Sequence, residues 1–488
     1  MSAQNLIDRS VSSVKWNVIN RILSSGFGFF QTIILARILP VNTFGVYETA
    51  VAMIALTRIV SNFGLGPAFW HRSPETEDIE RAAANHFSIN SIFSIIWALL
   101  MIAGGLVFFK QAQSDIKLAY YILILSDLIV QILNTPRVVL VRKVQHERLA
   151  VLSMSTTILT AFVSISMALL GFKIWALLVK NIINALLNIL LMALWRPVWK
   201  IRFAWNPNVI RYYMHFGSRS FLARLILEAL DRVDDLWTSI FLGTQALGFY
   251  SRAYRFAIQP RILISEPVYL VAGGVYAELK NDRERLSEAF MRINSLMIRS
   301  GFLIGGALFI VAPEFICVAL GEKWLPMLDV FRLMLIFTLF DPIKQTLANL
   351  FTALGKPEII VRIRVVQLLV MIGGLFGLGL LFDISGVAIA VDIMLIVGVL
   401  LLMWMAKKNI DFSLDKLLRI PVIAMSAGIF ISFLISTLIR TESDLFLGFI
   451  KILFYMGVYG TILFVWDRQE VKALFNILKN HTVKYWHP

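Results

Sequence analysis

Arginines lie inside membrane-length apolar stretches of this sequence, where a charged side chain is costly. Arg21 and Arg224 each lie in one such stretch, and Arg58 and Arg261 lie in the stretches that follow. A charged residue at the centre of a bilayer costs about 2.5 to 3.5 kcal/mol on insertion scales, so these residues are expected to face a wet, protein-lined interior. A guanidinium is always charged and binds phosphate oxygens through paired hydrogen bonds. The arginines therefore indicate a site for a phosphate or a diphosphate.

Three further arginines are candidates for the same anion. Arg255 lies near the others in sequence, whereas Arg37 and Arg252 lie close enough to segment ends to extend their charge to the membrane surface. The predicted substrate-binding residues are Arg21, Arg224, Arg58, Arg261, Arg255, Arg37 and Arg252.

Carboxylates accompany these arginines, and two interpretations of them remain open. A carboxylate in a poorly solvated site can titrate near neutral pH, so it can bind a coupling proton or sodium ion. Alternatively the charges pair with each other and hold helices together, as Arg224 and Glu228 can at a spacing of four residues. For Asp392, a role in helix packing is at least as well supported. The candidates for ion coupling or charge pairing are Glu48, Asp127, Glu228, Asp231, Asp234 and Asp235.

The composition places these charges in a membrane protein. Of the 488 residues, 58% are hydrophobic, which is more than one soluble core needs. Apolar runs of spanning length predict an all-α integral membrane protein with about fourteen transmembrane helices. The runs lie near residues 15–39, 43–66, 84–109, 116–139, 150–171, 174–195, 213–242, 245–276, 293–319, 326–353, 358–382, 384–406, 417–439 and 444–466.

Loop charges predict the orientation of these helices. Alternate loops are rich in Lys and Arg, as around Arg142, Lys200 and Lys407, whereas the loops between them carry few basic residues. Because cytoplasmic loops are the basic ones, both termini are expected inside. The net charge of +15 is therefore assigned to these loops and to anionic lipid, with no role for nucleic acid.

An internal repeat predicts the domain organisation. At an offset of 203 residues, Arg21 matches Arg224 and Arg58 matches Arg261, and the Gly-x-Tyr motif that begins at Gly45 matches the one at Gly248. Since each half holds six apolar runs, the halves should form two six-helix bundles in a parallel pseudo-two-fold repeat around a central cavity. The predicted divisions are residues 1–205, residues 206–410, and residues 411–488 with two extra helices and a basic tail.

Motifs for catalysis are absent from the sequence. Gly355 and Lys356 are followed by Pro357, so they do not form a phosphate-binding loop, and the sequence contains neither a dinucleotide fingerprint nor a His-Glu-x-x-His motif. The six histidines are scattered, which argues against a metal site. The sequence therefore predicts a protein that is not an enzyme and has no cofactor.

Several segments resemble a known transporter family. Leu35–Phe69 (LARILPVNTFGVYETAVAMIALTRIVSNFGLGPAF) and Leu242–Tyr254 (LGTQALGFYSRAY) resemble the Wzx-type polysaccharide and O-antigen flippases of the multidrug/oligosaccharidyl-lipid/polysaccharide exporter superfamily. Gly321–Leu325 (GEKWL) and Ala353–Pro357 (ALGKP) are similar to later signatures of that family, and Asp234 matches its acidic position ahead of the Leu-Gly pair.

The resemblance implies a function, a location and partners. It implies transfer of an undecaprenyl-diphosphate-linked oligosaccharide, a polysaccharide repeat unit, from the cytoplasmic to the outer face of the inner (plasma) membrane by alternating access. The expected partners are this substrate, an H⁺ or Na⁺ counter-ion, membrane lipids, a polysaccharide polymerase and a chain-length regulator. Alternatives are a flippase for the peptidoglycan precursor lipid II, a multidrug cation exporter of the same superfamily, and a non-transporting scaffold of a polysaccharide assembly complex.

Overall fold

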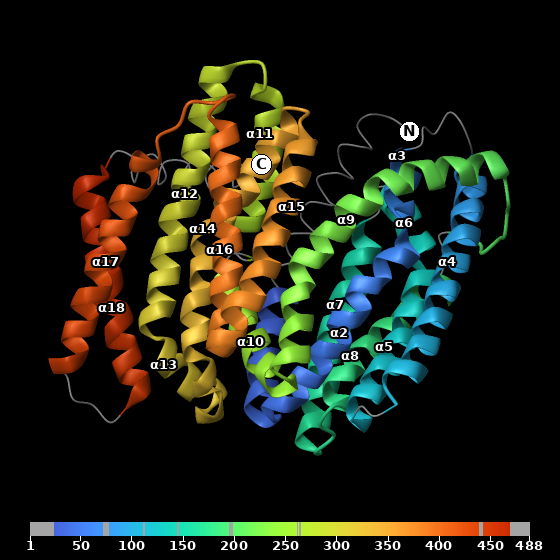
Figure 1. The fold of residues 1–488 in the computed structure, drawn as a ribbon, viewed down its shortest axis with the longest axis horizontal. Helices are drawn as coiled ribbons and strands as arrows, with labels where there is room; N and C mark the ends of the chain where they lie inside the picture. The colour runs from blue at the N-terminus through green and yellow to red at the C-terminus, as the bar shows by residue number, and fades with distance from the viewer. Residues whose placement is uncertain are drawn as a thin grey trace, which may run out of the picture. The chain divides into compact units, whose positions relative to one another are not determined.

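The computed structural model describes residues 24–71, 78–110, 113–143, 146–194, 199–260, 262, 265–438 and 443–468. Every secondary-structure element in these ranges is a helix, which confirms the predicted all-α class. The chain forms two compact units, Met1–Gly248 and Phe249–Pro488. Figure 1 shows the helices of each unit along the chain.

The first unit holds most of the residues predicted to do chemistry. Residues 24–38 are helical and precede α2. The following elements are α2 (Val41–Asn62), α3 (Leu65–His71), α4 (Ile79–Phe108), α5 (Ser114–Ile132), α6 (Asn134–Arg142), α7 (His146–Leu169), α8 (Trp175–Asn188), the π-helical turn η1 (Ile189–Leu194) and α9 (Pro207–Phe241).

The second unit starts within α10 (Thr244–Ala257). It continues with α11 (Glu266–Leu279), α12 (Arg283–Ile310), α13 (Ala312–Phe315), η3 (Ile316–Leu320), η4 (Glu322–Met327), α14 (Leu328–Ala353), α15 (Pro357–Gly374), η5 (Leu375–Gly379), α16 (Leu380–Ala406), α17 (Leu414–Leu438) and α18 (Asp444–Trp466).

Many of these helices are suited to a bilayer. Among the described residues, eight helical segments are long and apolar enough to cross a membrane, or nine if the bent pair of α5 and α6 forms one span. This finding confirms a protein that crosses the membrane several times. The count of about fourteen spans, the positions of the termini and the three predicted divisions stay predictions.

Helix breaks occur where the backbone cannot continue. The predicted run over residues 245–276 was wrong as one helix, because α10 ends at Ala257 and α11 begins at Glu266. Pro260 lies between them and has no N–H to donate to the preceding turn. The predicted boundary between residues 382 and 384 is confirmed, since Asp383 has a φ of 50° and interrupts the helical backbone.

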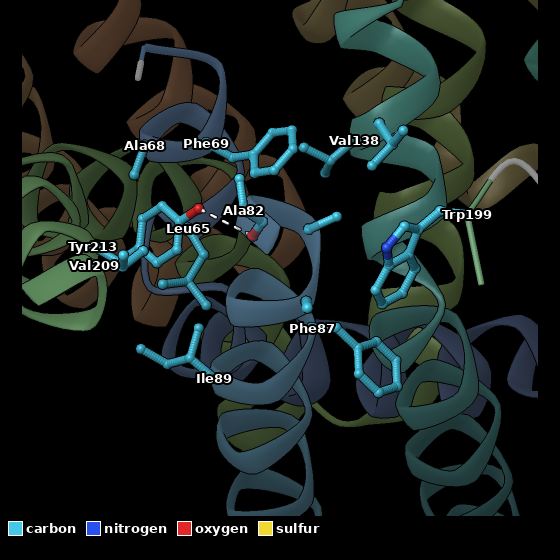
Figure 2. Packing of buried hydrophobic residues seen from close by; sticks show 13 residues of the cluster. Leu65, Ala68, Phe69, Ala82, Phe87, Ile89, Val138, Trp199, Val209 and Tyr213 are labelled. Atoms are coloured by element: carbon cyan, nitrogen blue, oxygen red, sulfur yellow. Dashed lines mark hydrogen bonds between the residues drawn. The ribbon is translucent and has the colours of Figure 1, made fainter. Parts of the chain in front are cut away.

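Aromatic and small residues form a buried cluster in the first unit, near the start of α4. Phe69, Ala82 and Tyr213 are almost fully buried there, and the Tyr213 hydroxyl donates to the Ala82 carbonyl over 3.5 Å. Figure 2 shows Phe87 and Trp199 in the same cluster. The cluster joins α3, α4, α6 and α9, and of these helices α9 also carries a residue of the polar cavity described below.

Two glycines of the first unit bring helix backbones into direct contact. A Cβ at Gly45 would lie 1.6 Å from the Thr244 carbonyl oxygen, and a Cβ at Gly248 would lie 2.5 Å from the Val41 carbonyl oxygen. Val41 and Thr244 are themselves equivalent at the offset of 203 residues. The approach of α2 to the start of α10 is therefore reciprocal, as a local two-fold relation between the two segments requires.

The last helix, α18, is anchored to the rest of the second unit by buried polar side chains. In α18, the Tyr455 hydroxyl donates to the Phe302 carbonyl over 2.7 Å, and the Tyr459 hydroxyl donates to the Arg299 carbonyl over 2.8 Å. The Arg299 guanidinium donates to Asp467 at the end of α18, with both side chains less than a tenth exposed. Near the opposite end of α18, Lys451 and Glu314 of α13 form a second buried ion pair.

Removing the Arg299 charge is expected to destabilise the second unit strongly. Breaking a buried ion pair leaves an uncompensated charge and costs about 3 to 5 kcal/mol, so Arg299→Ala should lower the melting temperature in detergent clearly. Arg285→Ala on the same helix is the control, because Arg285 and its partner Asp282 are 75% and 48% exposed. Its effect should stay below about 1 kcal/mol. Equal melting temperatures for the two variants would contradict a stabilising role of the buried pair.

Candidate functional site

A small polar cavity lies inside the first unit, between α2, α5, α8 and α9. Its volume is about 150 Å³, which suits one small polar group. Two arginines, one aspartate and two asparagines are among its lining side chains. The lining residues are Val51, Ile54, Ala55, Arg58, Leu123, Ser126, Asp127, Val130, Asn181, Asn184 and Arg232.

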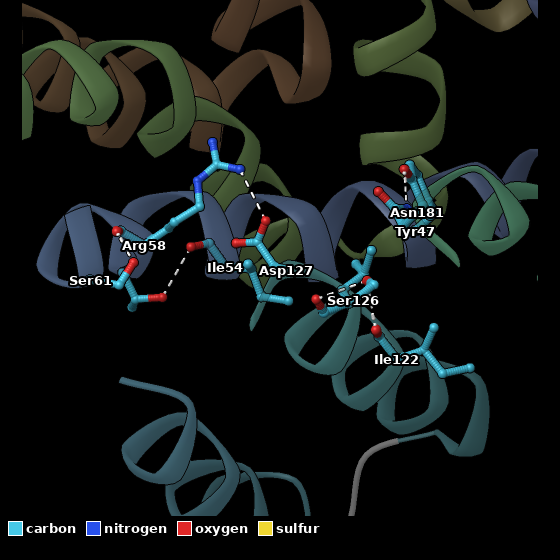
Figure 3. A network of polar contacts seen from close by, with 10 residues as sticks. Tyr47, Ile54, Arg58, Ser61, Ile122, Ser126, Asp127 and Asn181 are labelled. Atoms are coloured by element: carbon cyan, nitrogen blue, oxygen red, sulfur yellow. Dashed lines mark hydrogen bonds and ion pairs between the residues drawn. The ribbon is translucent and has the colours of Figure 1, made fainter. Parts of the chain in front are cut away.

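Arg58 and Asp127 form the first ion pair of this cavity. The Arg58 Nη1 atom lies 3.5 Å from the Asp127 Oδ1 atom, and the two side chains are 42% and 18% exposed (Figure 3). The pair is long, and the other Asp127 oxygen has no hydrogen-bond partner among the described residues. A guanidinium has five N–H donors. Arg58 therefore keeps donors for a further anion.

Arg232 brings a second guanidinium to the cavity, from α9. Its Nη1 atom lies 3.2 Å from the Asp235 Oδ2 atom, one turn further along the helix. Glu48 of α2 and Glu228 of α9 are close enough to Arg232 to attract it electrostatically. The cavity thus brings together two cations from helices far apart in sequence, and the four carboxylates that interact with them all belong to the predicted ion-coupling residues.

Asparagines of α8 complete the polar lining. The Asn181 side-chain amide donates to the Tyr47 hydroxyl over 3.0 Å, so the tyrosine of the first Gly-x-Tyr motif orients a cavity residue (Figure 3). Asn184 lies almost one turn further along α8 and faces the same space. Neutral amides can hydrogen-bond a sugar or a phosphate without adding charge.

Sequence reasoning missed three residues of this lining. Arg232 was not among the predicted substrate-binding residues, although it follows directly after the predicted Asp231. Asn181 and Asn184 were missed because uncharged amides are common in helices, although their spacing of three residues in an apolar segment was a usable signal.

The remaining predicted arginines do not line this cavity. Arg37, Arg224 and Arg255 are exposed, whereas Arg252 is buried in α10 with 5% of its surface accessible. The pairing of Arg224 with Glu228 is not formed among the described residues. Arg21 and Arg261 lie outside the described residues, so the two matched pairs stay predictions.

The predicted acidic residues fall into two groups. Glu48 and Asp234 are buried, and Asp127 and Asp235 are mostly buried. Glu228 is half-buried and Asp231 is exposed. In the second unit, Asp392 is also buried, and neither of its carboxyl oxygens has a hydrogen-bond partner among the described residues.

Comparison with known proteins identifies the family. The model of a family described as polysaccharide biosynthesis protein matches residues 34–329, which is more than half of the chain. This chain belongs to that family. The matched region contains α2, α5, α8 and α9, so the whole cavity lies within it.

Relatives of this polysaccharide biosynthesis protein are named for the biosynthesis or transport of several glycans. The succinoglycan biosynthesis transport protein ExoT of Rhizobium meliloti is 28% identical over 326 residues, which are 64% of this chain and 63% of ExoT. The lipopolysaccharide biosynthesis protein WzxC of Escherichia coli is 21% identical over 382 residues, 73% of this chain and 72% of WzxC. These matches confirm the predicted resemblance to polysaccharide flippases.

Solved transporters share the fold of this polysaccharide biosynthesis protein. The lipid II flippase MurJ in an inward closed conformation superposes with a TM-score of 0.73 and is 15% identical in sequence. The match covers 94% of this chain and 100% of MurJ. A multidrug resistance MATE family transporter in its inward-facing conformation has a TM-score of 0.62, with 16% identity, 79% of this chain and 95% of that chain covered. Together with the apolar helices, the relatives confirm a multi-pass inner-membrane protein. ExoT is named a transport protein and MurJ a flippase.

Proposed function

We propose that this protein moves an undecaprenyl-diphosphate-linked oligosaccharide from the cytoplasmic to the outer face of the inner membrane, and that the Arg58–Arg232 cavity holds its diphosphate. The observation that carries this proposal is that two guanidiniums from α2 and α9 line one interior cavity. The names of the relatives, which refer to succinoglycan and lipopolysaccharide, support the substrate class. The volume of about 150 Å³ suits the phosphates rather than the sugars.

The two ion pairs suggest how the phosphates bind and leave. Asp127 and Asp235 neutralise the arginines while the cavity is empty, which lowers the cost of keeping two cations inside a membrane protein. An incoming diphosphate would compete with these carboxylates for the guanidinium donors. Because each arginine has a partner to return to, release of the substrate does not leave a bare charge.

The same carboxylates are the proposed coupling site. When the diphosphate takes over Arg58, Asp127 loses its cation and binds a proton or sodium ion more readily. The proposed coupling residues are Glu48, Asp127, Asp234 and Asp235, with Asp392 as a further buried carboxyl. Alternating access would come from rocking of the two predicted six-helix bundles, with the lipid tail left in the bilayer.

A lipid II flippase is the second candidate. Its substrate also carries a diphosphate, and the fold resembles that of MurJ. A multidrug cation exporter fits less well, because cationic substrates favour carboxylate-lined sites without arginines. A scaffold of a polysaccharide assembly complex, working beside the polymerase and the chain-length regulator, would not need the cavity charges at all.

Repressing the gene in its native cell distinguishes the first two candidates. We expect surface polysaccharide to fall at least tenfold while lipid-linked oligosaccharide accumulates on the cytoplasmic face and cells keep growing. The measurement is the ratio of surface glycan to lipid-linked precursor. Lysis with accumulation of lipid II would favour the peptidoglycan alternative, and an unchanged ratio would overturn the proposal.

A further inference from the structure

A larger cavity lies in the second unit, between α12, α17 and the end of α18. Its volume is about 620 Å³, within the usual range for organic ligands. Seven of its side chains are ionic, and apolar side chains surround them. It is lined by Glu288, Met291, Arg292, Ser295, Arg299, Asp415, Lys416, Leu417, Arg419, Ile420, Ile423, Trp466 and Asp467. It contains no residue of the Arg58–Arg232 cavity.

Buried residues form a rigid base for this cavity. The Arg299 Nε atom donates to the Asp467 Oδ2 atom over 2.6 Å, and its Nη1 atom donates to the Ser295 carbonyl over 3.2 Å. The Arg299 side chain is 6% exposed. The base is thus formed by the end of α18 and by α12, and its central charge, Arg299, is almost fully buried.

The wall of the cavity has a net positive charge of one. Three of its four cations have carboxylate partners: Arg292 with Glu288 at 2.5 Å, Arg419 with Asp415 at 3.8 Å, and Arg299 with Asp467. The exposed Lys416 has no ion-pair partner among the described residues. A ligand with a single negative charge would neutralise this wall.

The cavity opens beside a surface suited to lipid chains. Ile423 and Trp466 at its edge are 39% and 61% exposed, and further along the same two helices Phe430 and Leu453 are 68% and 58% exposed. Tryptophan at such a position is typical of the boundary between lipid head groups and chains. Lys407, in the nearby connection between α16 and α17, belongs to a loop predicted to be cytoplasmic.

We propose that this cavity binds the head group of an anionic glycerophospholipid of the cytoplasmic leaflet, with its acyl chains along α17 and α18. One phosphodiester charge balances the wall, and Lys416 with the spare donors of Arg292 and Arg419 provides its contacts. A zwitterionic lipid would leave the positive charge uncompensated. A free phosphate would fill only a small part of 620 Å³ and would leave the apolar edge bare.

Lipid binding to the purified full chain tests this site. With a fluorescent phosphatidylglycerol in detergent micelles, we expect Lys416→Glu to weaken binding at least tenfold, because the wall charge changes from plus one to minus one. Phosphatidylcholine binding should remain weak in both proteins. Lys407→Glu is the matched control, since it makes the same charge change on an exposed lysine nearby that does not line the cavity. Equal melting temperatures of all three proteins show that they are folded.

Three outcomes would overturn the proposal. Equal loss of binding in Lys416→Glu and Lys407→Glu would mean diffuse attraction of anionic lipid. Displacement of phosphatidylglycerol by millimolar inorganic phosphate would mean a free-anion site. Displacement by undecaprenyl phosphate at a far lower concentration than by unlabelled phosphatidylglycerol would make the cavity a substrate site. None of these results depends on the transport proposal, which concerns the other unit.

Discussion

Replacing Arg58 by alanine is expected to lower glycan export about tenfold to a hundredfold while the protein still reaches the membrane. A hydrogen bond to a charged group contributes about 1.5 to 3 kcal/mol, and loss of that amount at the diphosphate gives this range. Arg58 is 42% exposed and its ion pair is 3.5 Å long, so folding depends on it less than substrate binding does. The measurement is surface polysaccharide relative to lipid-linked precursor, at matched protein levels.

Two controls make this result specific. Arg202→Ala removes a 65% exposed arginine of the same unit and should leave export unchanged. Arg58→Lys keeps the charge but loses the forked geometry, so it should fall between wild type and Arg58→Ala. Arg232→Ala should resemble Arg58→Ala, and the double variant should lose less than the two effects combined because both arginines bind one group. Normal export by the double variant would favour the scaffold alternative.

Placing a methyl group at Gly45 is expected to prevent the first unit from packing. The new Cβ would lie 1.6 Å from the Thr244 carbonyl oxygen, which belongs to backbone and cannot rotate away. Overpacking of a core usually costs about 1 to 3 kcal/mol, and a backbone-to-backbone clash of this depth should exceed that range. Gly45→Ala should therefore give little monodisperse protein on size-exclusion chromatography after detergent extraction.

Gly274→Ala is the control for this experiment. Gly274 lies in α11, and a Cβ there meets nothing within 4 Å. Alanine is also the better helix former by about 1 kcal/mol, so this variant should be at least as stable as wild type. A well-behaved Gly45→Ala protein would show that α2 and α10 do not touch through their backbones.

Much of the helical pattern was predictable because it depends on local sequence. Apolar runs and their boundaries follow from side-chain hydropathy, and the Asp383 break follows from a charged residue between two runs. The division of residues 245–276 into two helices was not predicted, although Pro260 indicates it. The mean hydropathy of a run hardly changes with a single proline, whereas the helix loses a backbone hydrogen-bond donor at that position.

The candidate site was only partly predictable, because it depends on which helices become neighbours. Arg58 and Asp127 were both predicted, but for different roles, and only packing of α2 against α5 brings them together. Arg232 was passed over in favour of Arg224, which the repeat singled out and the structure leaves exposed. A repeat reveals equivalent positions in two segments; it does not reveal which side of a helix faces a cavity.

The anchoring of α18 makes the body of the second unit depend on the C-terminal segment. Arg299 and Glu314 belong to the body of the second unit, yet both direct a buried charge at a residue of the C-terminal segment. Without that segment each would lack its counter-ion inside the protein. Removing the C-terminal segment would therefore do more than expose apolar surface, because it would also leave two buried charges of the second unit without their counter-ions.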